Sequence, residues 1–286
     1  MFSRSLWELY EPVHDVVYFT PEARQAADDA GMRGFWMGYF AMRAAPLGPV
    51  GPDVVTSCFY VFSPERARRA LPDAWRYGSP REMLAARNRG VDGAMRRLHG
   101  NDVVAGPAMA EAADLAWEAA MSADTAGRVL GAANQALAPP EEPHVRLWQA
   151  VTTLREHRGD GHIAVLVSRG IGPVAAQILK GAAGESDPGI LREGRKWDED
   201  TWRATEAGLR GRGWIDQTGR LTEAGAAEHA RIEEATDAAA EQPWRALGSD
   251  ATNRLAELLA PLARDVVRAG LLPGGNPVGL TASARL

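Results

Sequence analysis

Three residues that could do acid–base or metal chemistry lie within one stretch of six: His157, Asp160 and His162. Imidazole and carboxylate groups act as general acids and bases and as metal ligands. The spacing does not match a zinc signature, and the pattern HExxH is absent. Asp160 also fits the N-cap of a helix beginning near His162. Catalysis at this cluster is therefore one alternative to a plain turn, and we predict no metal and no cofactor.

A second group of candidates consists of aromatic and polar residues at helical spacing. Residues 10, 14 and 18 share one helical face, and Arg43 lies on a helix rich in aromatic residues. Small-molecule pockets are mostly aromatic with a few placed polar groups, and an arginine there can hold a carboxylate or stack on a ring. Ordinary core packing, with Arg43 reaching solvent, is the alternative. The predicted ligand-binding residues are Tyr10, His14, Tyr18, Trp36, Tyr39, Phe40, Arg43, Phe59 and Tyr60.

The amino-acid composition favours a globular protein and argues against several other classes. The 286 residues are 45% hydrophobic and 24% charged, with a formal net charge of −5, which is typical of a globular chain. The single cysteine, Cys58, excludes a disulfide framework. We expect no membrane span and a cytoplasmic protein, because no run of 18 apolar residues and no apolar leader is present. Mild acidity argues against a general nucleic-acid binder.

The elements that must position these residues are predicted to be helices, so the fold class is mainly α. The proline-rich segment 138–143 is the best linker, and it divides a helical, possibly ligand-binding domain (1–138) from a second domain (144–286). The pattern of the second domain predicts helices over 147–157, 162–169, 173–182, 198–212, 222–241 and 249–269, a turn over 158–161, a loop over 184–195 and a small hairpin over 213–221.

That order of elements resembles a winged helix-turn-helix domain. The sequence motif Leu209–Ile215, followed by Gly219–Gly225, resembles the corresponding motif of the MarR-type regulators. The resemblance covers roughly residues 145–270. It implies a recognition helix, a β-hairpin wing and a homodimer formed through 222–241 and 249–269. The whole chain also resembles a bacterial helix-turn-helix-like family that brings no established activity. The sequence motifs that carry this resemblance are Gly34–Phe40, Ala45–Gly48 and Leu154–His162.

Charge argues against DNA reading by the expected recognition helix. That helix would begin with Asp198, Glu199 and Asp200, where phosphate contacts normally need basic or polar donors. Residues 196–241 carry six basic and eleven acidic side chains. The acids could equally stabilise the helix N-terminus. DNA binding is therefore possible but disfavoured.

Three functional readings follow. The first is a protein that senses or sequesters an aromatic or amphipathic small molecule, with DNA reading weakened or lost. The second is a ligand-responsive transcriptional regulator. The third is an enzyme of biosynthetic secondary metabolism that uses His14 or the cluster His157, Asp160 and His162. Because fold does not settle function, we place the first ahead of the second.

Overall fold

The computed structural model describes residues 1–272, and the regular structure within them is helical. The last part of the predicted second domain, residues 273–286, lies outside the described residues. The N-terminal helices are α1 (Ser3–Phe19), α2 (Pro21–Asp29), α3 (Phe35–Ala44), η1 (Ala45–Leu47), α4 (Pro52–Phe59), α5 (Pro64–Arg68), η2 (Asp73–Arg76), α6 (Pro80–His99), α7 (Asn101–Val104), α8 (Pro107–Ser122) and α9 (Val129–Gln135). The remaining helices are α10 (Pro143–Ser168), α11 (Pro173–Ala182), α12 (Pro188–Arg195), α13 (Glu199–Gly211), α14 (Glu223–Ala239), α15 (Gln242–Leu247) and α16 (Ser249–Arg268).

Short polar side chains cap the start of several of these helices. Thr20 accepts a hydrogen bond from the Ala23 backbone N–H, with Pro21 in the first turn of α2. Ser79 and Glu82 form a capping box at the start of α6. These caps satisfy backbone donors that the first turn of a helix leaves free.

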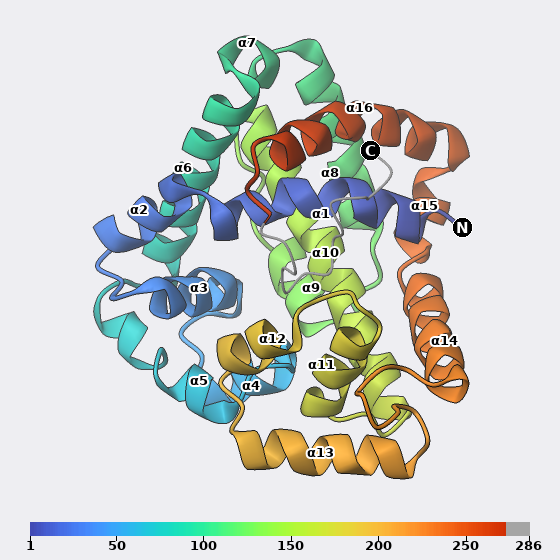
Figure 1. Ribbon diagram of the computed structural model, residues 1–286. Helices are drawn as coiled ribbons and strands as arrows, with labels where there is room; N and C mark the ends of the chain where they lie inside the picture. Colours follow the sequence, from blue (N-terminus) through green and yellow to red (C-terminus); the bar gives the residue numbers. More distant parts are fainter. Residues whose placement is uncertain (273–286) are drawn as a thin grey trace.

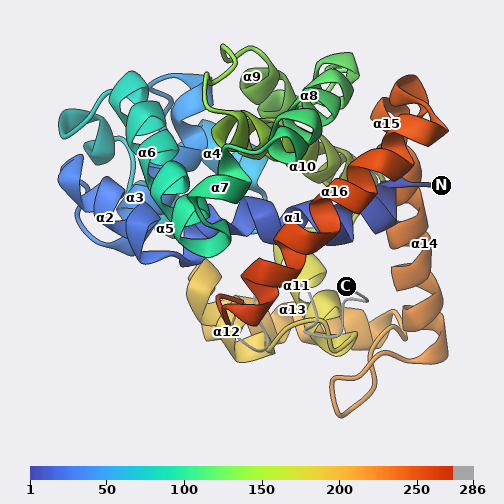
Figure 2. The same ribbon diagram turned by 90° about the horizontal axis from the view of Figure 1, so that it is seen from above.

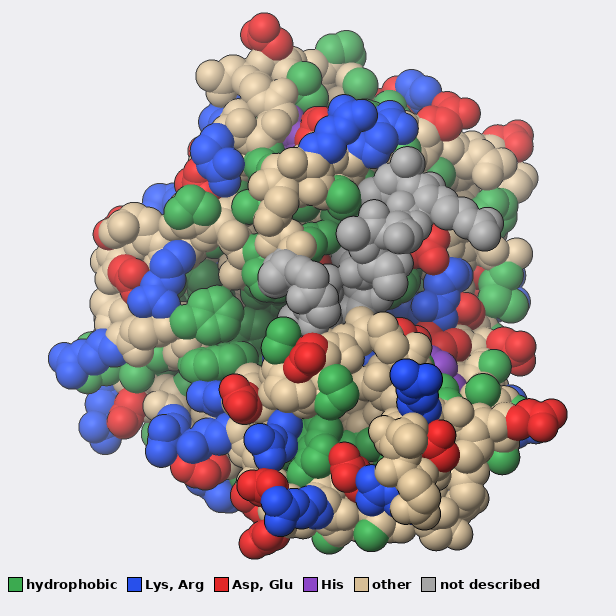
Figure 3. Space-filling view, in the orientation of Figure 1, with side chains coloured by type: hydrophobic (Ala, Val, Ile, Leu, Met, Phe, Trp, Pro, Cys, Tyr) green, Lys and Arg blue, Asp and Glu red, His purple; other side chains and the backbone are tan. Residues whose placement is uncertain are grey.

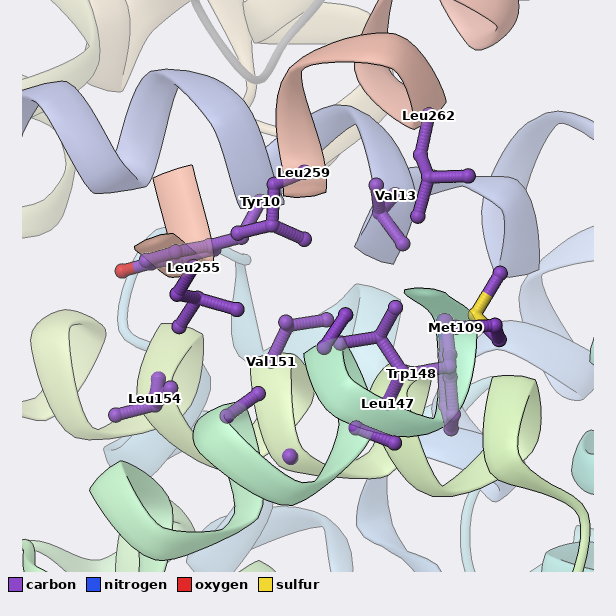
Figure 4. Close-up of a cluster of buried hydrophobic side chains, with 14 of the residues drawn as sticks. Tyr10, Val13, Met109, Leu147, Trp148, Val151, Leu154, Leu255, Leu259 and Leu262 are labelled. Atoms are coloured by element: carbon purple, nitrogen blue, oxygen red, sulfur yellow. The ribbon is translucent and has the colours of Figure 1, made fainter. Parts of the chain in front are cut away.

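The central core joins the beginning, middle and end of the chain. Helices α1, α8, α10 and α16 cross in the middle of the molecule (Figures 1 and 2). Figure 4 shows Tyr10 and Val13 of α1 facing Trp148 of α10 and Leu259 of α16. One apolar core therefore contains residues from both sides of the proline-rich segment. The division into two domains at that segment stays a prediction.

Two smaller cores lie on either side of the central one. The first is formed by α2 to α6 and is dominated by Phe40, Phe59 and Phe62. The second is formed by α10 to α14 and contains Ile178 and Trp202. Helices α11, α12 and α13 of this unit lie together at the lower edge of Figure 1. After α13, Ile215 and Leu221 form one isolated antiparallel bridge, and the described residues contain no longer β-ladder.

Two local predictions are wrong. The predicted turn at 158–161 is helical, because α10 continues without a break from Pro143 to Ser168. Asp160 consequently lies inside this helix and does not cap one that begins near His162; its carboxylate instead accepts from the Gly131 N–H in the first turn of α9, at 2.8 Å. The predicted loop over 184–195 contains α12, for which Asp187 is the N-cap. The apolar run at 54–62 is mostly helical, since α4 ends at Phe59.

One further property concerns membranes. Among the described residues, no single helix is long and apolar enough to cross a bilayer. Only α10 and α11 taken together, with a bend of 103° between them, meet that test by length and composition.

Candidate functional site

A chamber of about 370 Å³ lies between the N-terminal helices and the unit formed by α11 to α14. Its walls come from α1, α3, α4, α10, α11, α14 and the end of α12. The α10 residues that line it are Arg155, Arg158, Gly159, His162, Ile163 and Leu166, which recur at the three- and four-residue spacing of one helical face. One face of a single helix thus forms one side of the chamber.

The opposite side is an aromatic wall built from α3 and the residues after α4. The ring centroids of Tyr39 and Phe62 lie 5.5 Å apart, and those of Phe59 and Phe62 lie 6.4 Å apart. All three rings line the chamber. Such a wall offers a flat apolar surface to a ligand.

Tyr60 connects this wall to the helices below it. Its backbone has a φ of 56°, a left-handed conformation that is rare for a bulky residue and costs about 1–3 kcal/mol. The conformation brings the phenol to the turn between α10 and α11, where its O–H donates to the Ile171 carbonyl at 2.5 Å. A strained residue thus lines the chamber and ties its two sides together.

Buried ion pairs lie beside the aromatic wall. Arg43 donates two hydrogen bonds to Glu156, at 2.8 and 2.9 Å. Arg155 donates to both Glu156 and Glu11, at 3.1 and 3.0 Å. Burial alone would raise the pKa of the Glu156 carboxyl, but Arg43 and Arg155 outweigh it and lower that pKa to about 2. Glu156 is therefore ionised at neutral pH.

Other polar atoms at the chamber have no partner among the described residues. Arg158 and Gln177 are each only 6% exposed, yet Nη1 of Arg158 and Oε1 of Gln177 make no hydrogen bond within the described part of the chain. Both residues line the chamber. Buried polar groups in native proteins are nearly always hydrogen-bonded, so such atoms require an explanation.

A second, much smaller cavity of about 40 Å³ lies on the other side of Tyr39 and Arg43. There His14 Nδ1 is 2.9 Å from the Thr152 hydroxyl and Nε2 is 3.2 Å from the Tyr18 hydroxyl. The Thr152 hydroxyl donates its proton to the Trp148 carbonyl, so it can only accept from His14. Nδ1 of His14 therefore carries the proton and donates to Thr152, while Nε2 accepts from the Tyr18 hydroxyl. Burial, with Arg155 nearby, holds the pKa of His14 well below its usual value, so the ring is neutral. The cavity has room for roughly one water molecule.

The predicted ligand-binding residues therefore divide into three groups: those that line both cavities, those that line one of them and those that line neither. Tyr39 and Arg43 line both cavities. Phe59 and Tyr60 line only the chamber, whereas His14 and Tyr18 line only the small cavity.

The third group lines neither cavity. Tyr10 belongs to the central core and Phe40 to the N-terminal core. Trp36 packs against that N-terminal core under the guanidinium of Arg66, which lies 4.4 Å from its ring centroid. Arg43 does not reach solvent as the packing alternative supposes, because it is held by Glu156.

The polar cluster on α10 does not converge on one point. The Asp160 carboxylate accepts from the Gly131 backbone N–H at 2.8 Å, and burial raises the pKa of its carboxyl to about 6. His162 lies on another face, with Nδ1 2.9 Å from the Thr236 hydroxyl. Burial lowers the pKa of His157 to about 4. Among the described residues, no group of three or more His, Cys, Asp or Glu side chains could hold a metal ion.

Several lining residues escaped the sequence analysis: Glu11, Arg155, Glu156, Arg158, Gln177 and Arg195. Glu11 carried a usable signal, since it is a carboxylate next to Tyr10, on the helix that also carries the candidates His14 and Tyr18. The others carried none, because each lies far from the aromatic residues in sequence.

The exposed face of α13 carries both signs of charge. Asp198 caps the helix by accepting from the Thr201 backbone N–H at 2.7 Å, so this acid has a structural use. Arg203 pairs with Glu199, and Arg210 pairs with Glu206 at 3.2 Å. Basic and acidic side chains alternate along the lower edge of the molecule, where α13 lies (Figure 3).

The three short helices α11 to α13 and the chamber above them define a helix-turn-helix protein with an attached helical part. A family model described as "Helix-turn-helix family" matches residues 3–273. The chain belongs to this helix-turn-helix family over nearly its whole length. No curated protein and no solved structure matches the chain.

Proposed function

We propose that this helix-turn-helix protein binds a small molecule in the chamber and thereby senses or sequesters it. The observation that carries the proposal is the pair of buried, unpartnered polar atoms, Arg158 Nη1 and Gln177 Oε1, at a chamber of about 370 Å³. A donor and an acceptor left without partners cost free energy that a polar ligand recovers. The chamber volume falls in the range of small-molecule sites.

The shape of the chamber supports an amphipathic ligand. Its aromatic side accepts an apolar ring, while the α10 and α11 side offers charged and amide groups. The ligand would touch both the N-terminal helices and the helix-turn-helix unit. In this proposal the hairpin at Ile215 and Leu221 corresponds to the wing of a MarR-like domain.

A glycine of α10 provides the test. Gly159 lines the chamber, and a Cβ there would have only the Glu156 carboxylate within 4 Å, at 3.8 Å. Gly159→Leu should place an isobutyl group in the chamber while improving helix propensity by up to about 1 kcal/mol. We expect at least one compound of a metabolite panel to raise the melting temperature of the wild type and not of this variant.

The matched control is Gly208→Leu, at an exposed helical glycine of α13 with open space around its Cβ. This variant should respond to the compound as the wild type does. An equal response of Gly159→Leu, or no response of the wild type to any compound, contradicts the proposal. The nine tryptophans allow the same titration by fluorescence.

A ligand-responsive transcriptional regulator is the second candidate, favoured by the exposed position of α13. Against it, Arg203 and Arg210 are paired with acids of the same helix. We therefore expect no retarded band with the protein's own promoter DNA, even at low salt. A band that weakens steeply as salt rises would support the regulator instead.

A further inference from the structure

We propose that the chamber takes an organic anion, a carboxylate or a phosphate ester, whose charge lies against Arg195. This inference rests on the proposed function, because it names the chemical class of the ligand in the same chamber. Arg195 is the last residue of α12 and lines the chamber opposite α10. Its guanidinium carbon lies 4.3 Å from the centroid of the Phe62 ring.

Arg195 lacks the partner that the other chamber arginines have. Its Nε is buried without a hydrogen bond, and no carboxylate of the described residues lies within ion-pair distance of it. Arg43 and Arg155 each pair with an acid. An unpaired cation in such a place costs free energy, which an anion would recover.

The local charge balance points the same way. Around the aromatic wall three guanidinium groups, those of Arg43, Arg155 and Arg195, face two carboxylates, those of Glu11 and Glu156. Burial is the main cause that lowers the pKa of Arg195 to about 10, and the charges of Arg43 and Arg155 add to it. Of these three guanidinium groups, only that of Arg195 has no carboxylate of the described residues within ion-pair distance.

None of the other carboxylates that line the chamber lies within ion-pair distance of Arg195. The chamber's other charged groups are Arg4 and Arg158 with Glu233, His229 with Glu185, and Lys180 and Glu8. The carboxylates of Glu233 and Glu185 are engaged by their own basic partners. The anion site is thus located at the Phe62 side of the chamber.

The residues around Arg195 can also accommodate an aromatic ring of the ligand. Phe59, Phe62 and Tyr39 form the wall beside it, so an aryl group can lie on the rings while the anion meets the guanidinium. The backbone at this point leads directly into α13. The Ser63 N–H donates to the Arg195 carbonyl at 3.0 Å, and the Trp197 indole N–H donates to the Val61 carbonyl at 2.9 Å.

Calorimetric titration with three matched probes tests the inference: 1-naphthoate, 1-naphthyl phosphate and the neutral 1-naphthamide. We expect at least one anion to bind the wild type more tightly than the amide. Arg195→Met should weaken the anion by at least about 30-fold, the effect of removing one partner of a buried charge pair. It should leave the amide unchanged. Arg203→Met, at an exposed arginine of α13, is the control and should bind all probes as the wild type does.

The melting temperature without ligand provides a second readout. Because Arg195 is desolvated and pairs with no carboxylate of the described residues, Arg195→Met should raise this temperature by roughly 2 °C or more. A lower melting temperature would assign Arg195 to support of Phe62 and contradict the inference.

Two binding outcomes also overturn it: equal affinity for amide and anions, and no binding of either anion. If the amide binds as well as the anions and Gly159→Leu abolishes all three, the chamber function stands while the anion assignment falls. A preference for the phosphate over the carboxylate, or the reverse, identifies which anion the site takes.

Discussion

At the scale of single residues, Glu156 is the most consequential side chain of the site. It is 1% exposed and accepts hydrogen bonds from both Arg43 and Arg155. Glu156→Gln removes the charge and leaves two buried guanidinium groups poorly compensated. We expect a loss of about 3–5 kcal/mol in the free energy of unfolding, measured by urea denaturation. The exposed Glu199→Gln is the control, and a loss below about 1 kcal/mol for Glu156→Gln would contradict this account.

His157 makes stability depend on pH. The side chain is neutral in the folded state, because burial and then Arg128 lower its pKa from 6.5 to about 4. Between these two values the unfolded chain binds more protons, so stability falls as the pH drops from about 6.5 to 4. His157→Gln should make the fall in melting temperature over this interval shallower, while His162, whose pKa burial also lowers to about 4, keeps part of it. An unchanged slope would assign the acid sensitivity to other groups.

Helical spacing was enough to select Tyr39, Arg43, His14 and Tyr18, because residues four apart on one helix share a face. It could not separate the two cavities they line, because α10 and the ion pair of Arg43 with Glu156 divide them. The position of Arg195 in the chamber could not be predicted from helical spacing. Its place beside Phe62 depends on the packing of α12 against a segment more than 100 residues earlier.

At the scale of elements, α10 shows how glycine misleads a sequence pattern. Gly159 and Gly161 suggested a turn, yet α10 is continuous there and buried on most sides. A Cβ at Gly161 would lie 2.0 Å from Nη1 of Arg128. That guanidinium donates to the carbonyls of His157 and Ala239, at 2.7 and 2.8 Å, and so joins α9 to α10 and α14. Close approach, not a turn, explains this glycine.

The two glycines should therefore respond oppositely to alanine. Gly159→Ala fills open space in a helix and should raise the free energy of unfolding by about 0.5–1 kcal/mol. Gly161→Ala should lower it by about 1–3 kcal/mol, because Arg128 must move away from its carbonyls. Chemical denaturation of both variants measures the difference. Equal effects of the two substitutions would show that Arg128 does not hold these helices.

The start of α13 was predictable because Asp198 followed by helix-forming residues is a local cap signal. Helix α12 was not, since the glycines at 184, 189 and 194 resemble a loop. Its position depends on tertiary contacts such as Arg66 donating to the Glu193 carbonyl at 2.8 Å.

At the scale of the whole molecule, the negative charge of the helix-turn-helix unit has a structural use. The Glu233 and Asp237 carboxylates of α14 pair with Arg4 of α1, and Asp237 also pairs with Arg158 of α10, at 2.7 Å. These acids thus join the unit to the N-terminal part and are not free to repel DNA. A homodimer through 222–241 and 249–269 stays a prediction. The apolar side chains of α16 already pack in the central core, so a dimer would use other faces.

The central claim is that the chamber between the N-terminal helices and the helix-turn-helix unit is a ligand site. A crystal structure of the protein with 1-naphthoate or 1-naphthyl phosphate, whichever binds more tightly in calorimetry, tests it most directly. We predict electron density for the ring against Phe62 and Tyr39, with the anionic group within hydrogen-bonding distance of Arg195. An unoccupied chamber at a saturating concentration of that compound, or density for it only elsewhere on the protein, would contradict the claim.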